Sequence, residues 1–286
     1  MNPTERRQRY RSHLAREQCI QPASIFDPIS SRLAASLGFE IGMFAGSVAS
    51  GVVLGAPDLT VITLSEFVDQ ARRITRASDI SLMVDSDHGY GNALNVMRTV
   101  SELEAAEVCA MSIEDTALPT PFGTTGATVI SLDESVGKMR AAVAAKRDRE
   151  TIVIGRCAAM PIEGIAGVVA RAAAYEAAGV DALFFTGLST KAHVVAVEAV
   201  TTLPLMLGSA PAELQDAAWL AAHRVRIALK GHLPFQTMIQ GIYEALKHHA
   251  DGGEPAGLSH RAPSAEVMAT ALANADYDAW QGEFLR

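Results

Sequence analysis

Two aspartates spaced two residues apart, Asp85 and Asp87, offer the clearest chemistry in the sequence. They follow the apolar run 80–84, which is typical of a buried strand, and they precede the glycine-rich segment 88–91. Oxygen-rich side chains gathered at a strand end are the ligands that a hard cation such as Mg²⁺ prefers. The same Asp-x-Asp-x-Gly pattern also forms ordinary turns through local side-chain hydrogen bonds. The segment alone leaves a metal site and a structural turn both open.

Strand-like runs alternate along the chain with alanine-rich segments of helical period. Parallel neighbours require a crossover connection, so this alternation predicts a parallel sheet. Eight such units favour an α/β fold of the (β/α)8 TIM-barrel type, and no Gly-x-Gly-x-x-Gly follows the first strand to suggest a dinucleotide fold. We predict one domain, 1–286, with an N-terminal helix within 1–20 and a C-terminal helical extension over 251–286. The predicted strands cover 23–27, 40–45, 80–84, 108–114, 151–156, 180–185, 203–207 and 225–230.

In such a barrel, the residues at the carboxyl ends of the strands surround one shared mouth, where active sites lie. Acidic groups, an arginine, a histidine and small residues fall at these ends, whereas the strand bodies are mostly aliphatic or aromatic. The candidate mouth residues are Asp27, Gly46, Ser47, Asp85, Asp87, Glu114, Asp115, Arg156, Thr186, Gly187, Gly208, Ser209, Gly231 and His232.

Several of these residues also have a purely structural interpretation. Asp27 precedes a proline and could cap the next helix. Ser47 could likewise be a cap, although its segment also offers backbone N–H groups to a carboxylate. Arg156 could pair with a structural carboxylate instead of binding a substrate carboxylate, and His232 could be a packed core histidine.

Composition restricts the partners and the compartment. The 286 residues carry a formal net charge of −8, which argues against nonspecific binding to nucleic acid. No apolar stretch approaches the roughly 20 residues that span a bilayer, and the polar start lacks the apolar core of a signal peptide. Cys19, Cys109 and Cys157 give no disulfide framework. We expect a cytoplasmic protein without membrane or nucleic-acid partners.

Short motifs at the predicted strand ends carry a family resemblance over nearly the whole chain. They are Phe26-Asp27-Pro28, Gly46-Ser47-Val48-Ala49-Ser50, Ala56-Pro57-Asp58, Asp85-Ser-Asp-His-Gly-Tyr-Gly-Asn92, Ile113-Glu114-Asp115-Thr116 and Gly231-His232. In these motifs the chain resembles the isocitrate lyase/phosphoenolpyruvate mutase superfamily, and within it the oxaloacetate decarboxylase branch. The resemblance implies a (β/α)8 barrel whose eighth helix is exchanged between the subunits of a dimer, with two dimers forming a homotetramer.

The resemblance also implies roles for individual residues. A Mg²⁺ ion, which Mn²⁺ could replace, would bind Asp85 directly and Asp58, Asp87 and Glu114 through water. The substrate would contact Gly46, Ser47, Val48, Arg156 and His232, of which Arg156 and His232 would be catalytic. The implied reaction is the decarboxylation of oxaloacetate to pyruvate and CO₂ through a metal-stabilised enolate, which makes the protein a carbon–carbon lyase.

Two other functions stay open. Segment 116–126 lacks the Cys, Lys and His of the superfamily's lyase loop, which disfavours isocitrate cleavage. Cys157-Ala158 and Ser209-Ala210 depart from the usual pattern and leave the exact 2-oxo acid open. The alternatives are a lyase or hydrolase acting on another 2-oxo acid or a phosphonate, and a non-catalytic barrel that binds a metabolite. The Gly and Pro content of segment 116–126 is compatible with a lid.

Overall fold

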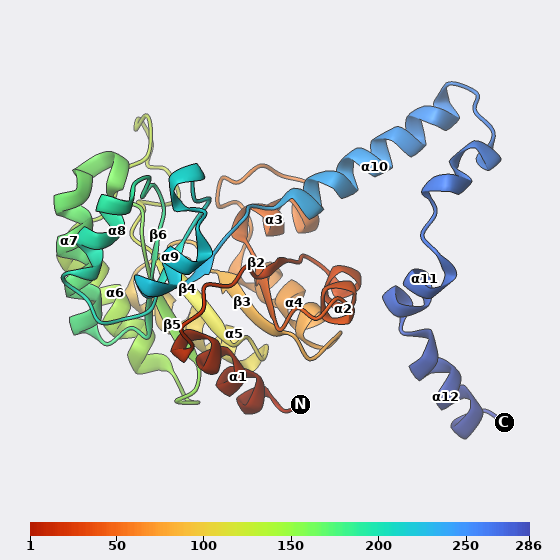
Figure 1. The fold of residues 1–286 in the computed structure, drawn as a ribbon, viewed down its shortest axis with the longest axis horizontal. Coiled ribbons are helices and arrows are strands. Elements are labelled where there is room, and N and C mark those ends of the chain that lie inside the picture. Colours follow the sequence, from red (N-terminus) through yellow and green to blue (C-terminus); the bar gives the residue numbers. More distant parts are fainter.

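The strands form one parallel sheet in the order β1 to β8 in a computed structural model that describes residues 1–286 (Figure 1). An isolated parallel bridge joins Ile20, just before β1, to Ile227 in β8, which closes the sheet into a barrel. The predicted (β/α)8 fold is confirmed. The strands are β1 (Ala23–Ser24), β2 (Ile41–Phe44), β3 (Ser81–Asp85), β4 (Ala110–Glu114), β5 (Ile152–Cys157), β6 (Ala182–Phe185), β7 (Leu205–Leu207) and β8 (Val225–Ala228).

Helices surround the barrel because the strands are apolar on both faces and must be covered on both. Side-chain caps set several helix starts; for example, Thr63 accepts the N–H of Glu66 at 3.3 Å, and Glu66 accepts the N–H of Thr63 at 2.9 Å. The helices around the barrel are α2 (Pro28–Ser36), α3 (Gly46–Ala49), η1 (Ser50–Leu54), α4 (Leu64–Thr75), α5 (Ala93–Ala105), α6 (Leu132–Ala145), α7 (Met160–Ala178), α8 (Lys191–Glu198), η2 (Ala212–Leu214) and α9 (Ala217–Ala222).

Two helical segments are interrupted. The segment 212–222 divides into η2 and α9, because the Asp216 side chain accepts the N–H of Ala218 at 3.0 Å and starts a new helix. The segment 264–275 divides into α11 (Ala265–Leu272) and α12 (Asn274–Phe284) at Ala273, whose φ of 55° is left-handed.

Helix α1 (Pro3–Ala15) lies across the amino ends of the strands and is fixed there by arginines. Arg6 donates to the carbonyl of Thr75 at 2.8 Å, and Arg7 donates to the carbonyl of Val108 at 3.2 Å. Tyr10, between them and the barrel interior, is fully buried and donates to the sulfur of Met83 at 3.3 Å. These contacts satisfy carbonyl groups that precede the strands and close the amino end of the barrel.

The C-terminal elements leave the barrel (Figure 1). Helix α10 (Leu233–Ala250) projects outward and contains no buried residue, and η3 (Pro255–Arg261) leads from it to α11. Helix α11 contacts α2, where Arg32 donates to the carbonyl of Ala271 at 3.0 Å. No helix of the protein combines the length and the apolar character needed to cross a bilayer.

Candidate active site

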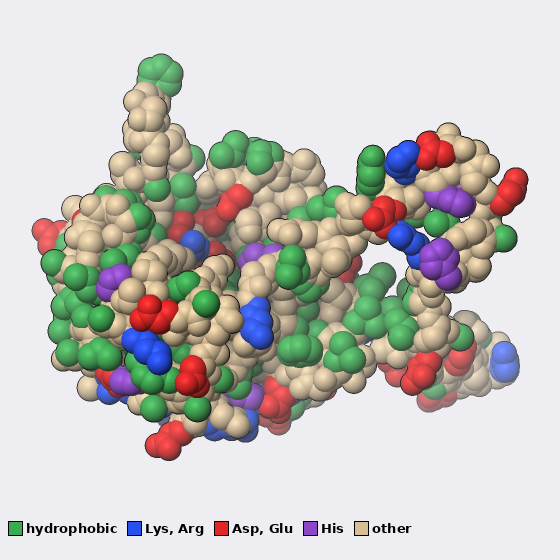
Figure 2. Space-filling view, turned by 45° about the horizontal axis from the view of Figure 1, so that its top comes forward, with side chains coloured by type: hydrophobic (Ala, Val, Ile, Leu, Met, Phe, Trp, Pro, Cys, Tyr) green, Lys and Arg blue, Asp and Glu red, His purple; other side chains and the backbone are tan.

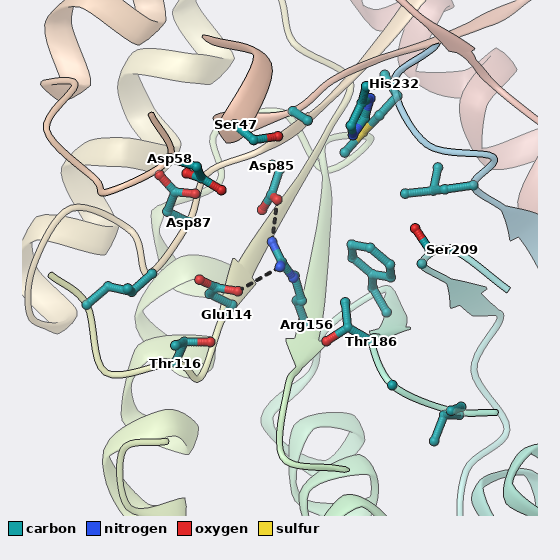
Figure 3. A pocket seen from close by; sticks show the side chains of 18 of the residues that line it. Ser47, Asp58, Asp85, Asp87, Glu114, Thr116, Arg156, Thr186, Ser209 and His232 are labelled. Atoms are coloured by element: carbon teal, nitrogen blue, oxygen red, sulfur yellow. Dashed lines mark hydrogen bonds and ion pairs between the residues drawn. The ribbon is translucent and has the colours of Figure 1, made fainter. Parts of the chain in front are cut away.

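A cavity of about 640 Å³ opens at the carboxyl ends of the strands (Figure 3). Most of the predicted site residues meet there, although they come from segments far apart in the sequence. Gly46 and Val48 do not line the cavity, but they flank Ser47, which does. The polar residues of the lining are Ser47, Asp58, Thr60, Asp85, Asp87, Glu114, Thr116, Arg156, Thr186, Ser189, Ser209 and His232.

Arg156 is at the centre of the acidic side of this cavity (Figure 3). Its Nη1 pairs with Asp85, and its Nη2 lies 3.0 Å from Oε2 of Glu114. Ser112 donates its hydroxyl to the other oxygen of Asp85 at 3.0 Å. The Phe184 ring lies 5.4 Å from the guanidinium carbon. Arg156 therefore holds the strand-end carboxylates of β3 and β4 in fixed orientations.

Negative charge exceeds positive charge in the cavity. Asp58, Asp85, Asp87 and Glu114 line it together with one arginine. Burial and the neighbouring Asp85 and Glu114 raise the pKa of Asp87 to about 8. Burial raises the pKa of Glu114 to about 7 against the opposing effect of Arg156, and burial together with Asp85 raises the pKa of Asp58. A divalent cation would relieve this like-charge repulsion.

The donor set fits a hydrated cation and does not fit an all-protein cage. No three His, Cys, Asp or Glu side chains lie close enough together to ligate one ion directly. Mg²⁺ commonly keeps several waters and binds one or two carboxylates. One direct ligand, with further carboxylates beyond the waters, is therefore compatible with this cavity.

Gly46 leaves room for Asp87. A Cβ added at Gly46 would lie 2.5 Å from Oδ1 of Asp87, closer than any ordinary contact. Asp87 itself has a φ of 47°, which turns the chain sharply after β3. The short helix α3 begins at Gly46 after Ala45, which provides no side-chain cap, so the first N–H groups of α3 have no partner within the helix.

His232 lies on a different side of the cavity from the acidic group (Figure 3). It is the residue before α10, and its Nδ1 lies 2.9 Å from the hydroxyl of Ser24 in β1. Burial lowers the pKa of His232, and the charge of Asp85 partly opposes this effect. Burial thus favours the neutral imidazole, which is held from β1.

Two candidate mouth residues have structural roles. Asp27 caps α2 and accepts the N–H of Ser30 at 2.7 Å, as its structural interpretation predicted. Asp115 is fully buried and turns away from the cavity. It accepts the N–H of Ala158 at 2.8 Å and the hydroxyl of Tyr175 at 2.8 Å.

Arg171 completes the network around Asp115. Its Nη1 lies 3.3 Å from Asp115 and 3.0 Å from the Ser135 hydroxyl, and its remaining nitrogens bind Glu163 and the carbonyl of Ile130. This network fixes Asp115 and Ala158. Asp115 directly follows Glu114 in the sequence, and Ala158 is two residues after Arg156. The network therefore supports the cavity wall from the side that faces away from the cavity.

The opposite wall of the cavity is neutral. Thr186 and Ser209 supply hydroxyl groups there. The unusual residues Cys157 and Ala210 do not line the cavity. Segment 116–126 stands out from the barrel (Figures 1 and 2), and Figure 2 shows acidic side chains in a hollow beside its base. Phe122 in this segment is fully exposed.

Sequence reasoning did not identify every residue that serves the site. Ser24 and Ser112 were assigned no role, because single serines within a strand carry no chemical pattern. Thr116 lies in a motif that the sequence singled out and lines the cavity. The alternation of side chains along β4 could have indicated Ser112, which is two residues before Glu114 and on the same face.

Comparisons with known proteins agree on one family. The model of the phosphoenolpyruvate phosphomutase family matches residues 11–250. A protein of Rhodopseudomonas palustris (strain BisB18) named oxaloacetate decarboxylase is 49% identical over 263 residues, which cover 92% of this chain and 91% of the relative.

Solved structures are similar over almost the whole chain. A phosphonopyruvate hydrolase in complex with oxalate and Mg²⁺ has a TM-score of 0.86 at 26% identity and covers 98% of this chain and 99% of its own. An oxaloacetate acetylhydrolase in complex with the inhibitor 3,3-difluorooxalacetate has a TM-score of 0.85 at 26% identity, with 99% and 98% coverage.

Proposed function

Because this chain belongs to the phosphoenolpyruvate phosphomutase family, we propose that it is an oxaloacetate decarboxylase, a lyase that converts oxaloacetate to pyruvate and CO₂. The observation that carries the proposal is the acid-rich cavity with Arg156 at its centre. The name of the relative that is 49% identical points to the same reaction.

We propose Mg²⁺ as the cofactor, with Mn²⁺ as a possible replacement. Asp85 would ligate the ion directly, and Asp58, Asp87 and Glu114 would hold its waters. When bound, the cation would act as a Lewis acid that stabilises negative charge developing on the ketone oxygen of the substrate. The four carboxyl groups that line the cavity together with a single arginine support this assignment.

The remaining residues would orient the two ends of oxaloacetate. Arg156 and the backbone N–H groups of Gly46, Ser47 and Val48 would bind the C1 carboxylate. His232 would lie beside the C4 carboxylate. When the C3–C4 bond breaks, its electron pair moves toward C2 and the ketone oxygen, CO₂ departs, and C3 takes up a proton. His232 would be within reach of that end of the substrate and would assist the proton transfer.

The test is a decarboxylation assay that follows both the loss of oxaloacetate and the formation of pyruvate in the presence of Mg²⁺. The wild-type protein should exceed the rate of Mg²⁺ alone by several orders of magnitude. Asp85→Ala should return to that background, whereas Asp69→Ala, which alters an exposed carboxylate on α4, should retain full activity. A wild-type rate equal to the metal background would refute the proposal.

Another 2-oxo acid or a phosphonate is the alternative substrate class. The neutral wall with Thr186 and Ser209 is the feature that would accept a different group at the distal end. A panel of 2-oxo acids and phosphonopyruvate, scored for pyruvate, distinguishes these substrates. Stabilisation by oxalate and Mg²⁺ without turnover of any panel member would instead support a non-catalytic metabolite-binding barrel.

We further propose a helix-exchanged dimer that pairs into a homotetramer. Helix α10 carries exposed Leu233, Ile239, Ile242 and Leu246, which a partner would need to cover. An apolar groove of about 670 Å³ beside α2 is available to receive such a helix. Light scattering after size-exclusion chromatography should give the tetramer mass, and Leu246→Asp should lower it. Monomer alone at micromolar concentration would contradict this assembly.

The three cysteines support a cytoplasmic location. Cys19, Cys109 and Cys157 are all free, and two of them are buried. A reducing compartment suits this state. Cell fractionation would test the assignment directly.

A further inference from the structure

The hydroxyl of Ser24 lies 2.9 Å from Nδ1 of His232. We propose that Ser24 is a positioning residue that fixes the imidazole of His232 so that Nε2 faces the substrate. The inference rests on the proposed function, since it concerns the residue assigned to the C4 end of oxaloacetate.

Ser24 acts on the site without entering it. His232 lines the catalytic cavity, whereas Ser24 lines the neighbouring apolar groove beside α2 and does not line the cavity. The backbone of Ser24 is fixed by its pairing with Met43 in the parallel ladder of β1 and β2. The serine therefore reaches the histidine from behind and from a rigid element.

The backbone of His232 makes hydrogen bonds only to the first turn of α10, where the N–H groups of Phe235 and Gln236 donate to its carbonyl at 3.1 and 3.4 Å. Gly231, immediately before it, has a φ of 79°, a left-handed conformation that favours glycine. His232 itself precedes α10, a helix without buried residues. The contact with Ser24 is the only hydrogen bond that its side chain makes within the protein.

The second ring nitrogen is left for the substrate. Nε2 of His232 makes no hydrogen bond within the protein, and it is not a buried atom. Because the residue lines the cavity, Nε2 is accessible from it. If the Ser24 bond is removed, the ring can turn about its Cβ–Cγ bond at little cost, which can place Cε1 where Nε2 was and would spread the reactive orientation over several rotamers.

The bond between Ser24 and His232 also crosses the closing line of the barrel, between β8 and β1. Strands β8 and β1 have no continuous ladder between them, and the barrel closes there through backbone bonds of Ile20 to Arg226 and Ala228 at 2.9 and 3.0 Å. Ser24 belongs to one side of this line and His232 to the other. The side-chain bond fixes the distance between them at the height of the cavity.

Kinetics of single and double variants test the inference. Ser24→Ala should lower kcat for oxaloacetate about tenfold and leave KM within about twofold, because substrate still binds but meets a misoriented ring. Ser24→Thr, which keeps the hydroxyl, should recover most of the loss. Ser36→Ala, an exposed serine on α2, is the matched control and should behave as wild type. In a His232→Ala background, Ser24→Ala should have no further effect.

An equal and independent loss in both backgrounds, or unchanged kcat in Ser24→Ala, would overturn the inference. An NMR measurement of the His232 ring nitrogens in the ligand-free protein provides a readout that does not depend on turnover. Their chemical shifts should change in Ser24→Ala and return in Ser24→Thr, and unchanged shifts would also overturn it. If the wild type lacks decarboxylase activity, the proposed function fails while the NMR result still decides whether Ser24 holds His232.

Discussion

The backbone of Gly46 lies against the carboxylate of Asp87, and a single added methyl group would come within 2.5 Å of its Oδ1. The two residues come from the ends of adjacent strands, β2 and β3. Because the backbone of α3 cannot easily withdraw, a side chain at position 46 would have to displace Asp87.

Gly46→Ala should therefore weaken Mg²⁺ binding about tenfold, which is the range for residues that orient a metal site without ligating it. Isothermal titration with MgCl₂ measures the affinity directly. Gly137→Ala is the control, because a Cβ at this helical glycine meets nothing within 4 Å. Equal Mg²⁺ affinity in Gly46→Ala and wild type would show that Asp87 has no part in holding the ion.

Replacement of Arg156 by lysine should impair the site although the charge is kept. Lysine cannot pair with Asp85 and Glu114 through two nitrogens at once, so both carboxylates lose a fixed orientation. We expect kcat/KM for oxaloacetate to fall about a hundredfold. Arg140→Lys, an exposed arginine of α6, is the matched control. A loss confined to a few fold would indicate that a point charge is sufficient at this position.

The stability of the metal-free protein should fall as the pH rises from about 4 to about 8. Asp87 has a pKa of about 8 in the folded protein and an ordinary value of 3.8, so between these limits the folded form holds a proton that the unfolded chain has released. The free energy of unfolding therefore falls progressively with pH until Asp87 ionises in the folded protein. Urea unfolding in EDTA at several pH values measures the free energy of unfolding.

Asp87→Asn should show a shallower decline over the same range and be relatively more stable at pH 9. Part of the decline should persist, because the pKa of Glu114 is also raised, to about 7. Asp69→Asn, at an exposed carboxylate of α4, should follow the wild-type curve. Parallel curves for all three proteins would contradict the raised pKa of Asp87.

Removal of Arg171 should destabilise the fold strongly. The residue is 2% exposed and its partner Asp115 is fully buried, so Arg171→Met would leave a buried carboxylate without its charge partner. The expected loss is about 3–5 kcal/mol in the free energy of unfolding. Urea denaturation measures it, with the exposed Arg140→Met as control. A loss below about 1 kcal/mol would show that Asp115 is satisfied by its other donors alone.

The sequence was sufficient for the barrel because short, mostly apolar strand-like runs alternate with helical segments, and several of these runs have a polar residue at or next to the carboxyl end. Asp85, Glu114 and Arg156 follow this rule, and their meeting in one cavity is a consequence of the parallel order. The interruption at Ala273 could not be predicted, because alanine favours helix and its left-handed φ depends on the surrounding structure.

The direction of individual side chains was the second feature that could not be predicted from the sequence. Asp115 follows Glu114 directly, so the two side chains point to opposite faces of the strand end, and only one of them can enter the cavity. Position in the sequence could not decide which. The bond from Ser24 to His232 was likewise out of reach, because it joins residues 208 positions apart across the closing line of the barrel.

The arginine-rich helix α1 determines by which end of the barrel substrate and products can pass. Because α1 seals the amino end, with Tyr10 fully buried against the interior, reactants and gas cannot pass straight through the barrel. The keto acid must therefore enter, and its products must leave, through the one opening at the carboxyl ends of the strands, beside which segment 116–126 stands. Any movement that narrows this opening would slow substrate binding and product release together.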